Sequence, residues 1–361
     1  MESLLKIRGK RIWPNVTPSP MSGVTDRPFR QVLWELAGGR IGMSVTEFVS
    51  VNALQRYTAP FFRQMRTFPG EYPLCIQIFG AEPEAMAHGA IQMVEAGADF
   101  VEINAGCPMQ KVIGKGGGSS LLRDLPRLQH ILQAVRKAID VPLFLKVRLG
   151  WDEKSINVLE TLHLAENEGV ELFTIHGRTR VQGYKGLADW DLIAATAAKA
   201  KIPVMGNGDI HSAQEAQSRL LEIPQLAGVG VGRALMHNPF LMGQVADLWE
   251  GKPIREPTGL EQLAMLQRYA QLLEADGFSP TGVLGRLKQM MARLTRCLEP
   301  DASDFRLELL HTLDLDRYMD RLALFYETEY KPQGYRFIPG RIESLNGKHS
   351  IEMEYGRQFR G

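Results

Sequence analysis

Side chains that could do chemistry follow several short apolar segments of this sequence, and a lone cysteine is prominent among them. Cys107 lies in the segment Asn-Ala-Gly-Cys-Pro, and a glycine-rich stretch follows at residues 114–118. A thiol on such a loop could be presented to a substrate and could donate a proton to it. The alternative is a small packed residue, which is the usual role of a lone cysteine.

Cations form a second group of candidates. Lys146 and Arg148 lie in the segment Lys-Val-Arg-Leu-Gly and point the same way on a strand, because successive side chains alternate. Two cations in one cavity are costly unless they meet anionic groups, so the pair indicates an anionic ligand. The alternative is a solvated pair at a strand end. His176 and Arg178 end another apolar run, and we expect them to face the same cavity.

Two glycine-rich segments are candidates for binding phosphate. Gly-Asn-Gly-Asp-Ile contains Asn207, Gly208 and Asp209, and Gly-Val-Gly-Arg-Ala contains Gly232 and Arg233. The backbone N–H groups of such loops can face an anion, and the dipole of a following helix favours negative charge. The alternative is that these glycines only form turns.

The elements that must position these residues alternate between short apolar runs and helix-patterned stretches. Eight units of this kind predict an α/β fold, a (β/α)8 TIM barrel over residues 1–250, with a doubly wound open sheet as the alternative. The candidates above follow the runs, at the ends of strands where barrel enzymes place their chemistry. The predicted strands are Val16–Ser19, Gly42–Thr46, Leu74–Phe79, Phe100–Asn104, Leu143–Val147, Leu172–His176, Ile202–Met205 and Gly228–Val231.

The pattern changes beyond the barrel. Residues 251–258 are polar and contain prolines, as in a linker, and residues 259–330 have the apolar periodicity of a small all-α helical-bundle domain. Residues 331–361 form a C-terminal extension whose structure the pattern does not decide.

Composition limits the classes of protein that fit. The chain has 361 residues, 44% of them hydrophobic, and a net charge of +1, so a nucleic-acid partner must be held by a local basic patch. The three cysteines, Cys75, Cys107 and Cys297, form no C-x-x-C pair, which argues against a zinc site and for a reduced, cytoplasmic setting. The histidines show no ligand spacing, so we predict no metal. No apolar run is long enough for a membrane span.

Six motifs, in chain order and each at a predicted strand end, resemble those of the tRNA-dihydrouridine synthases. The likeness is strongest to the bacterial B- and C-type branches, and it weakens after about residue 246. The motifs are PMSGVTDRPFR (Pro20–Arg30), NAGCP (Asn104–Pro108), KVRLGW (Lys146–Trp151), HGRTRVQGY (His176–Tyr184), NGDI (Asn207–Ile210) and GRALMHNP (Gly232–Pro239).

The resemblance implies reduction of uridine to 5,6-dihydrouridine in tRNA, with FMN as cofactor, NADPH as electron donor and no obligate protein partner. Hydride would reach C6 of uracil from reduced FMN, and Cys107 would donate a proton to C5. The residues implied to bind the cofactor are Pro20, Met21, Ser22, Gln77, Lys146, His176, Asn207, Gly208, Asp209, Gly232 and Arg233. Those expected to bind the base and the RNA are Asn104, Arg148, Arg178, Arg286 and Lys288.

Two other functions fit part of the sequence. An FMN barrel oxidoreductase that acts on a free pyrimidine, similar to dihydroorotate dehydrogenase, would share the phosphate loops and the lysine. A non-catalytic RNA-binding protein on a barrel scaffold would share the basic helical domain. The basic side chains around Arg286 could hold an RNA backbone, or they could form an ordinary solvated helix face.

Overall fold

The computed structural model describes residues 5–54 and 65–338. Its main sheet is parallel and curls into a barrel, in which β3 and β4 lie side by side without a hydrogen-bonded ladder between these described strands. β5 (Val49–Ser50) pairs with the end of β6. In order around the barrel the strands are β3 (Val16–Pro18), β11 (Gly228–Val231), β10 (Val204–Asn207), β9 (Leu172–His176), β8 (Leu143–Arg148), β7 (Phe100–Ala105), β6 (Leu74–Phe79) and β4 (Ser44–Val45). The predicted barrel is confirmed.

The predicted and observed strands differ at their ends. β10 begins at Val204, two residues later than expected, because Pro203 has no N–H to add to the ladder. The carbonyl of Pro203 still accepts a hydrogen bond from Phe173 N at 3.0 Å. The second run is reduced to the two-residue strand β4.

Alternation along the strands divides the barrel into an apolar shell, an apolar base and a polar upper interior. Outward residues such as Val101 and Leu145 pack against the surrounding helices in the main core. Inward residues near the strand starts, among them Phe100 and Phe144, form a separate apolar cluster, and these two rings stack at 4.7 Å. Inward residues near the strand ends are polar, so the polar side chains collect at the C-terminal end of the barrel.

A hairpin closes the base of the barrel. β1 (Leu5–Ile7) pairs antiparallel with β2 (Lys10–Ile12). Its apolar residues Leu5, Ile7 and Ile12 belong to the cluster at the base. The N-terminal end of the barrel is therefore filled.

Helices surround the barrel, and several begin at side-chain caps. Asp26 accepts a hydrogen bond from Phe29 N at the start of α1, and Asp124 and Ser212 cap α6 and α9 in the same way. The helices of this part are α1 (Arg27–Leu36), α2 (Val51–Leu54), α4 (Pro83–Glu95), α5 (Gln110–Ile113), η1 (Gly118–Arg123), α6 (Leu125–Ala138), α7 (Val158–Asn167), α8 (Trp190–Ala197), α9 (Ala213–Glu222), α10 (Ala234–His237) and α11 (Leu241–Trp249).

A helical region follows α11, as predicted. It begins at a capping box between Thr258 and Glu261, and a proline follows the Ser279 cap of its second helix. Its elements are α12 (Gly259–Ala275), α13 (Pro280–Leu294), η2 (Thr295–Cys297), β12 (Leu298–Glu299), α14 (Ser303–His311), α15 (Leu315–Leu324), η3 (Phe325–Glu329) and β13 (Arg336–Phe337). β13 pairs with β12, and the rest of the C-terminal extension, from residue 339, lies outside the described residues.

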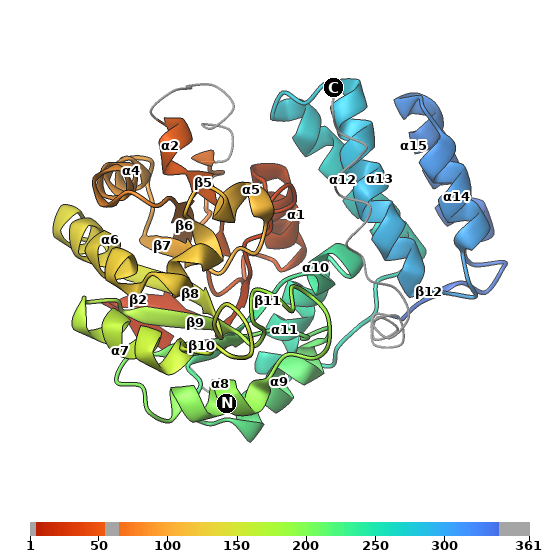
Figure 1. Ribbon diagram of the computed structural model, residues 1–361. Helices are drawn as coiled ribbons and strands as arrows, with labels where there is room; N and C mark the ends of the chain where they lie inside the picture. Colours follow the sequence, from red (N-terminus) through yellow and green to blue (C-terminus); the bar gives the residue numbers. More distant parts are fainter. Residues whose placement is uncertain (1–4, 55–64, 339–361) are drawn as a thin grey trace.

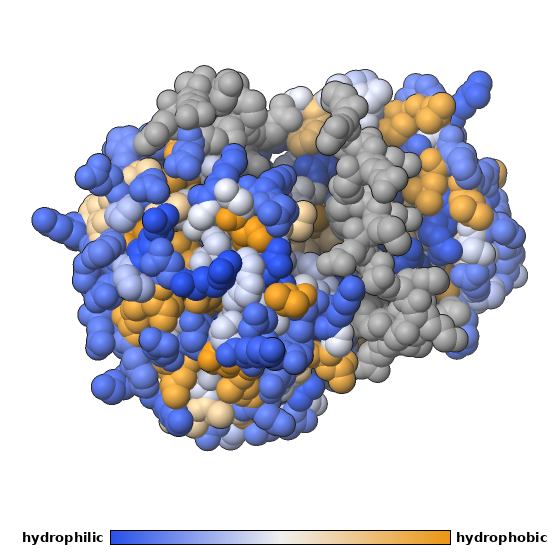
Figure 2. Space-filling view, in the orientation of Figure 1, coloured by the Kyte–Doolittle hydropathy of each residue, from blue (hydrophilic) through white to orange (hydrophobic). Residues whose placement is uncertain are grey.

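The helical region stands beside the barrel (Figure 1), where α12 packs against α1 and α13 packs against α10. Arg27 on α1 forms an ion pair at 3.1 Å with the buried carboxylate of Asp276, just after α12. In the view of Figure 2, the surface over the barrel is mainly hydrophilic, with separate hydrophobic patches. Within the described ranges no helix combines the length and the apolar character needed to cross a membrane.

Candidate active site at the C-terminal end of the barrel

A chain of buried amide groups connects the barrel interior to the cysteine loop. Asn104, near the end of β7, accepts hydrogen bonds at Oδ1 from Gly106 N at 3.0 Å and from Cys107 N at 2.8 Å. Its Nδ2 donates to Gln77 Oε1 at 2.8 Å, and Gln77 Nε2 donates to Glu102 Oε1 at 2.5 Å. The backbone that carries Cys107 is thereby fixed to side chains of two neighbouring strands.

Cys107 is buried, with 8% of its surface exposed. The glycine-rich segment folds onto it, because Ser119 donates to Cys107 O from both its backbone N, at 3.1 Å, and its Oγ, at 2.9 Å. Gly118 has φ +59°, and a Cβ there would lie 2.8 Å from Cys107 O, so this close approach requires glycine. Burial raises the pKa of the Cys107 thiol, more than the Met109 backbone and Arg148 lower it. The thiol is therefore protonated at neutral pH.

Lys146 lies inside the barrel on β8 and reaches Asn207 on β10. Its Nζ donates to Asn207 Oδ1 at 3.1 Å, while Asn207 Nδ2 donates to Ser19 Oγ at 3.0 Å and to Gly230 O at 2.7 Å. Burial lowers the pKa of Lys146 to about 8, against the nearby Glu102 carboxylate, which raises it. The ammonium is therefore mostly charged at pH 7, and an anionic ligand would stabilise it.

Arg148, on the same face of β8, joins two loops at the mouth of the barrel. Its Nε donates to Gly106 O at 2.9 Å, and its Nη1 donates to Thr179 O at 2.9 Å and to Gly183 O at 2.7 Å. Burial is the largest of the effects that lower its pKa to about 10. Arg148 thus holds the loop after β9 against the cysteine loop.

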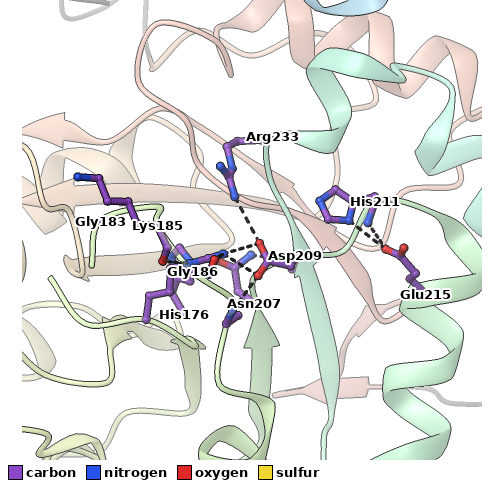
Figure 3. Close-up of polar contacts among 12 residues, drawn as sticks. His176, Gly183, Lys185, Gly186, Asn207, Asp209, His211, Glu215 and Arg233 are labelled. Atoms are coloured by element: carbon purple, nitrogen blue, oxygen red, sulfur yellow. Dashed lines mark hydrogen bonds and ion pairs between the residues drawn. The ribbon is translucent and has the colours of Figure 1, made fainter. Parts of the chain in front are cut away.

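Asp209, which follows β10, is the centre of a second cluster of charges. Arg178 Nη2 contacts its Oδ1 at 2.7 Å and its Oδ2 at 2.6 Å, and also donates to Gly186 O at 2.6 Å. Arg233 reaches the same carboxylate at 3.4 Å, as Figure 3 shows. Ala188 N donates to Oδ2 at 2.7 Å. The carboxylate is thus shared among the loops that follow β9, β10 and β11.

His176, at the end of β9, lies 3.3 Å from Arg178 Nη1 through its Nε2. Burial, and then the charges of Arg148, Lys146, Arg178 and Arg233, lower its pKa well below the ordinary value. The imidazole is therefore neutral and can accept a hydrogen bond.

Tyr184 belongs to the same group of residues, although the sequence pattern did not single it out. Its ring centroid lies 6.1 Å from that of His176, and the guanidinium carbons of Arg148 and Arg233 lie 5.4 and 4.7 Å from it. The side chain is 47% exposed. Its place at the end of the motif that begins at His176 is the signal that could have identified it.

This end of the barrel has the excess of positive charge that a bound anion requires. Lys146, Arg148, Arg178 and Arg233 gather there, and their nearby carboxylates are Glu102 and Asp209. Burial raises the pKa of Glu102, against the charge of Lys146 and the hydrogen bond from Gln77, which lower it. A Cβ on Gly232 would meet only Ser19 Cβ, at 3.8 Å, so this backbone borders open space. These residues fit a cofactor that carries negative charge.

The first motif follows β3 and begins next to Ser19, which accepts a hydrogen bond from Asn207. Pro20 and Met21 are half-buried and Ser22 is exposed. Met21 N donates to Thr25 Oγ1 at 3.1 Å, and Thr25 Oγ1 donates back to Met21 O at 3.2 Å, which fixes the turn. Gly208 is also tightly placed, since a Cβ there would lie 2.6 Å from Ala188 Cβ and 3.3 Å from His176 Cδ2.

The two predicted RNA-binding residues of the helical domain contact other groups than this cluster of charges. Arg286, on α13, forms an ion pair with Asp26 at 3.1 Å and donates to Gly23 O, so it joins the helical region to the barrel. Lys288 donates to Leu310 O at 2.8 Å and joins α13 to α14. Their contact with RNA stays a prediction. No cluster of side chains suited to a metal ion occurs in the described part of the chain.

Comparison with known proteins agrees with this geometry. Residues 17–325 match the family model described as dihydrouridine synthase (Dus). A probable tRNA-dihydrouridine synthase of Rhizobium leguminosarum bv. phaseoli is 41% identical over 241 residues, which are 67% of this chain and 74% of that protein. A probable tRNA-dihydrouridine synthase 1 of Synechocystis is 40% identical over 74% of this chain and 75% of its own length.

Two further comparisons concern the branch and the fold. A tRNA-dihydrouridine synthase B of Pseudomonas putida is 40% identical over 64% of this chain and 67% of that protein. Histamine dehydrogenase from Rhizobium sp. 4-9 superposes with a TM-score of 0.53 at 14% identity, over 74% of this chain and 50% of that one, and shows a shared fold only. The extent of the family match and the identities show that the chain belongs to the dihydrouridine synthase family, a family of oxidoreductases.

Proposed function

We propose that this chain reduces uridine to 5,6-dihydrouridine in tRNA. A flavin cofactor follows from membership of the family, and we propose that it is FMN, with NADPH as the electron donor. One observation carries the proposal: the buried Cys107, on the loop that follows β7, and Lys146, inside β8, lie at the same end of one barrel. Asn104 pairs in register with Lys146 and holds the Cys107 loop, so the two candidate groups are positioned by adjacent strands.

The residues of the pocket suit the parts of such a cofactor. Lys146, Gln77 and His176 would contact the ring system, where Lys146 offers a positive charge to the electron-rich edge. Gly208, Gly232 and Arg233 would hold the phosphate with backbone N–H groups and a guanidinium. FMN, when bound and reduced, supplies the hydride that is added to C6 of uracil.

Cys107 would provide the proton that completes the reaction. Burial keeps the thiol protonated, so it can donate to C5 of uracil, and the C5–H bond forms as the S–H bond breaks. Arg148 and Arg178 shape the walls around the base, because their guanidinium groups already hold the loops of the pocket. A base in folded RNA must leave its stack to reach this depth.

Position-resolved mapping of dihydrouridine in tRNA, with and without the gene, tests the proposal. We expect specific positions to lose the modification in the deletion strain and to regain it when purified protein is added with NADPH. Purified protein with a flavin absorption spectrum that reduces a free pyrimidine but leaves tRNA unchanged would support the alternative activity instead. A colourless protein without reductase activity would refute both.

A further inference from the structure

Two guanidinium groups flank the indole ring of Trp151, which lies on the loop after β8. The Cζ atom of Arg123 lies 4.8 Å from the ring centroid, and that of Arg180 lies 4.6 Å from it. A cation held over an aromatic face is attracted by the ring quadrupole and keeps its full charge. The two arginines are therefore restrained in position without being neutralised. We call Arg123, Trp151 and Arg180 the arginine–tryptophan platform.

Three successive loops at the mouth of the barrel form this platform. Arg123 ends η1, in the segment that follows the cysteine loop, and Trp151 and Arg180 follow β8 and β9. Arg180 N donates to Gly150 O at 3.0 Å, and Val181 N donates to Trp151 O at 2.9 Å. The platform is therefore built on the same loops as the candidate active site, at its outer edge.

Among the described residues, the charges of the platform lack counter-ions. Within the described ranges no carboxylate forms an ion pair with Arg123 or Arg180, and the one side-chain hydrogen bond of Arg180, at 3.5 Å, goes to the neutral Gln110. Arg178, by contrast, is paired with Asp209 at 2.6 Å. Arg123 is exposed and Arg180 is half-buried. Two restrained and uncompensated cations at the mouth of a pocket attract anions from solution.

We propose that Arg123 and Arg180, held against Trp151, bind backbone phosphates of the RNA next to the uridine that enters the pocket. This inference rests on the proposed function. Gln110, the hydrogen-bond partner of Arg180, follows Cys107 on the same loop, so the platform borders the thiol side of the pocket. Phosphate contacts fix the register of a nucleic acid without reading its sequence. In this protein such contacts would hold the RNA strand that carries the extracted uridine.

Kinetics with tRNA over a series of salt concentrations test the platform. Arg123→Ala and Arg180→Ala should each raise KM for tRNA about three- to tenfold. The plot of log(kcat/KM) against log salt has a negative slope, and each lost phosphate contact should make it shallower by about 0.7. Flavin content and the thermal midpoint should change little. Arg180→Lys keeps the charge and should restore most of the slope.

Arg219 offers a matched control. It lies 4.9 Å from the centroid of Trp190, on the outer helices, and it is paired with Glu222 at 3.0 Å. Arg219→Ala removes the same kind of contact and the same charge away from the mouth. It should leave KM and the salt slope at their wild-type values.

The outcomes separate this inference from the proposed function. If the wild-type protein forms dihydrouridine but the double variant Arg123→Ala/Arg180→Ala keeps the wild-type KM and slope, the platform does not bind RNA. A lower kcat without a change in slope would also overturn it, because a purely structural role predicts that result. If the wild-type protein forms no dihydrouridine, the proposed function fails, and fluorescence anisotropy of tRNA over the same salt series decides whether the platform binds RNA phosphate.

Discussion

The side chain of Asn104 and the backbone of Cys107 are joined by a hydrogen bond of 2.8 Å, and this bond fixes the thiol loop to the barrel wall. The same amide also accepts from Gly106 N and donates to Gln77, so one residue satisfies three buried partners. The position of the candidate proton donor therefore depends on a residue that need not touch the reacting atoms.

Replacement of Asn104 by alanine tests this dependence. The change leaves two backbone N–H groups and the Gln77 carbonyl oxygen without their partner, so the cysteine loop should shift and kcat should fall about 10- to 100-fold. Asn238→Ala removes a comparable buried amide, which lies at the end of α10 and donates to Gln244 on α11 at 2.8 Å. That control should lower the melting temperature without lowering kcat.

Removal of the Cys107 thiol should separate the two halves of the reaction, which are reduction of the flavin by NADPH and reduction of uridine by the flavin. Cys107→Ala should still bind flavin and oxidise NADPH, yet form dihydrouridine at least about 100-fold more slowly, because the proton donor is lost. Stopped-flow reduction of the flavin and mass spectrometry of the tRNA measure the two halves. Cys297→Ala, which removes a buried thiol in the helical region, should reduce stability and keep the modification. Loss of flavin from Cys107→Ala would indicate a structural thiol.

Flavin affinity should depend on pH through Lys146. Its pKa is about 8 in the free protein, and an anionic ligand raises it, so affinity is highest below pH 8 and falls as pH rises through that value. Titration of the apoprotein with FMN, followed by flavin fluorescence from pH 6.5 to 9.5, measures this at about half-unit intervals. Lys146→Met should bind more weakly and show a flat profile over the same range. A wild-type profile that is equally flat would exclude a charged contact from Lys146.

The Arg286–Asp26 ion pair should contribute strongly to the joint between the helical region and the barrel. Asp26 is buried, and burial raises its pKa while Arg286 opposes this. Arg286→Ala would leave a buried carboxylate unpaired and should cost about 2–4 kcal/mol of stability. Asp26→Asn combined with Arg286→Ala should recover part of the loss, because asparagine also caps a helix and carries no charge. Thermal unfolding of the wild type, the two single variants and the double variant completes a double-mutant cycle. If the two single losses of stability add up to the loss in the double variant, the pairing is contradicted.

The barrel could be predicted from the sequence because its signals are local. Each of the eight runs is apolar and short, and each polar cluster follows one run, so the direction of the strands alone brings Cys107, Lys146 and Asp209 to one end. The exact ends of the strands were less predictable, since β10 begins only after Pro203.

Partnerships between distant segments could not be predicted. The periodicity of α13 indicates a helix, but it does not say that Arg286 meets Asp26 rather than solvent. Likewise, the sequence places Arg178 and Asp209 at two strand ends, while their pairing depends on the register of β9 against β10. Trp151 lies in a recognised motif, yet its two cationic neighbours come from different loops.

The hairpin β1–β2 has a consequence for the order of events. It fills the N-terminal end of the barrel, so a reductant and an RNA must both reach the flavin through the opening at the C-terminal end. Under the proposed function, we therefore expect NADPH to leave before the RNA binds, with the electrons held on the reduced flavin in the interval. Initial rates with varied tRNA at several fixed NADPH concentrations should then give parallel double-reciprocal lines, as in ping-pong kinetics. Intersecting lines would mean that both occupy the protein together.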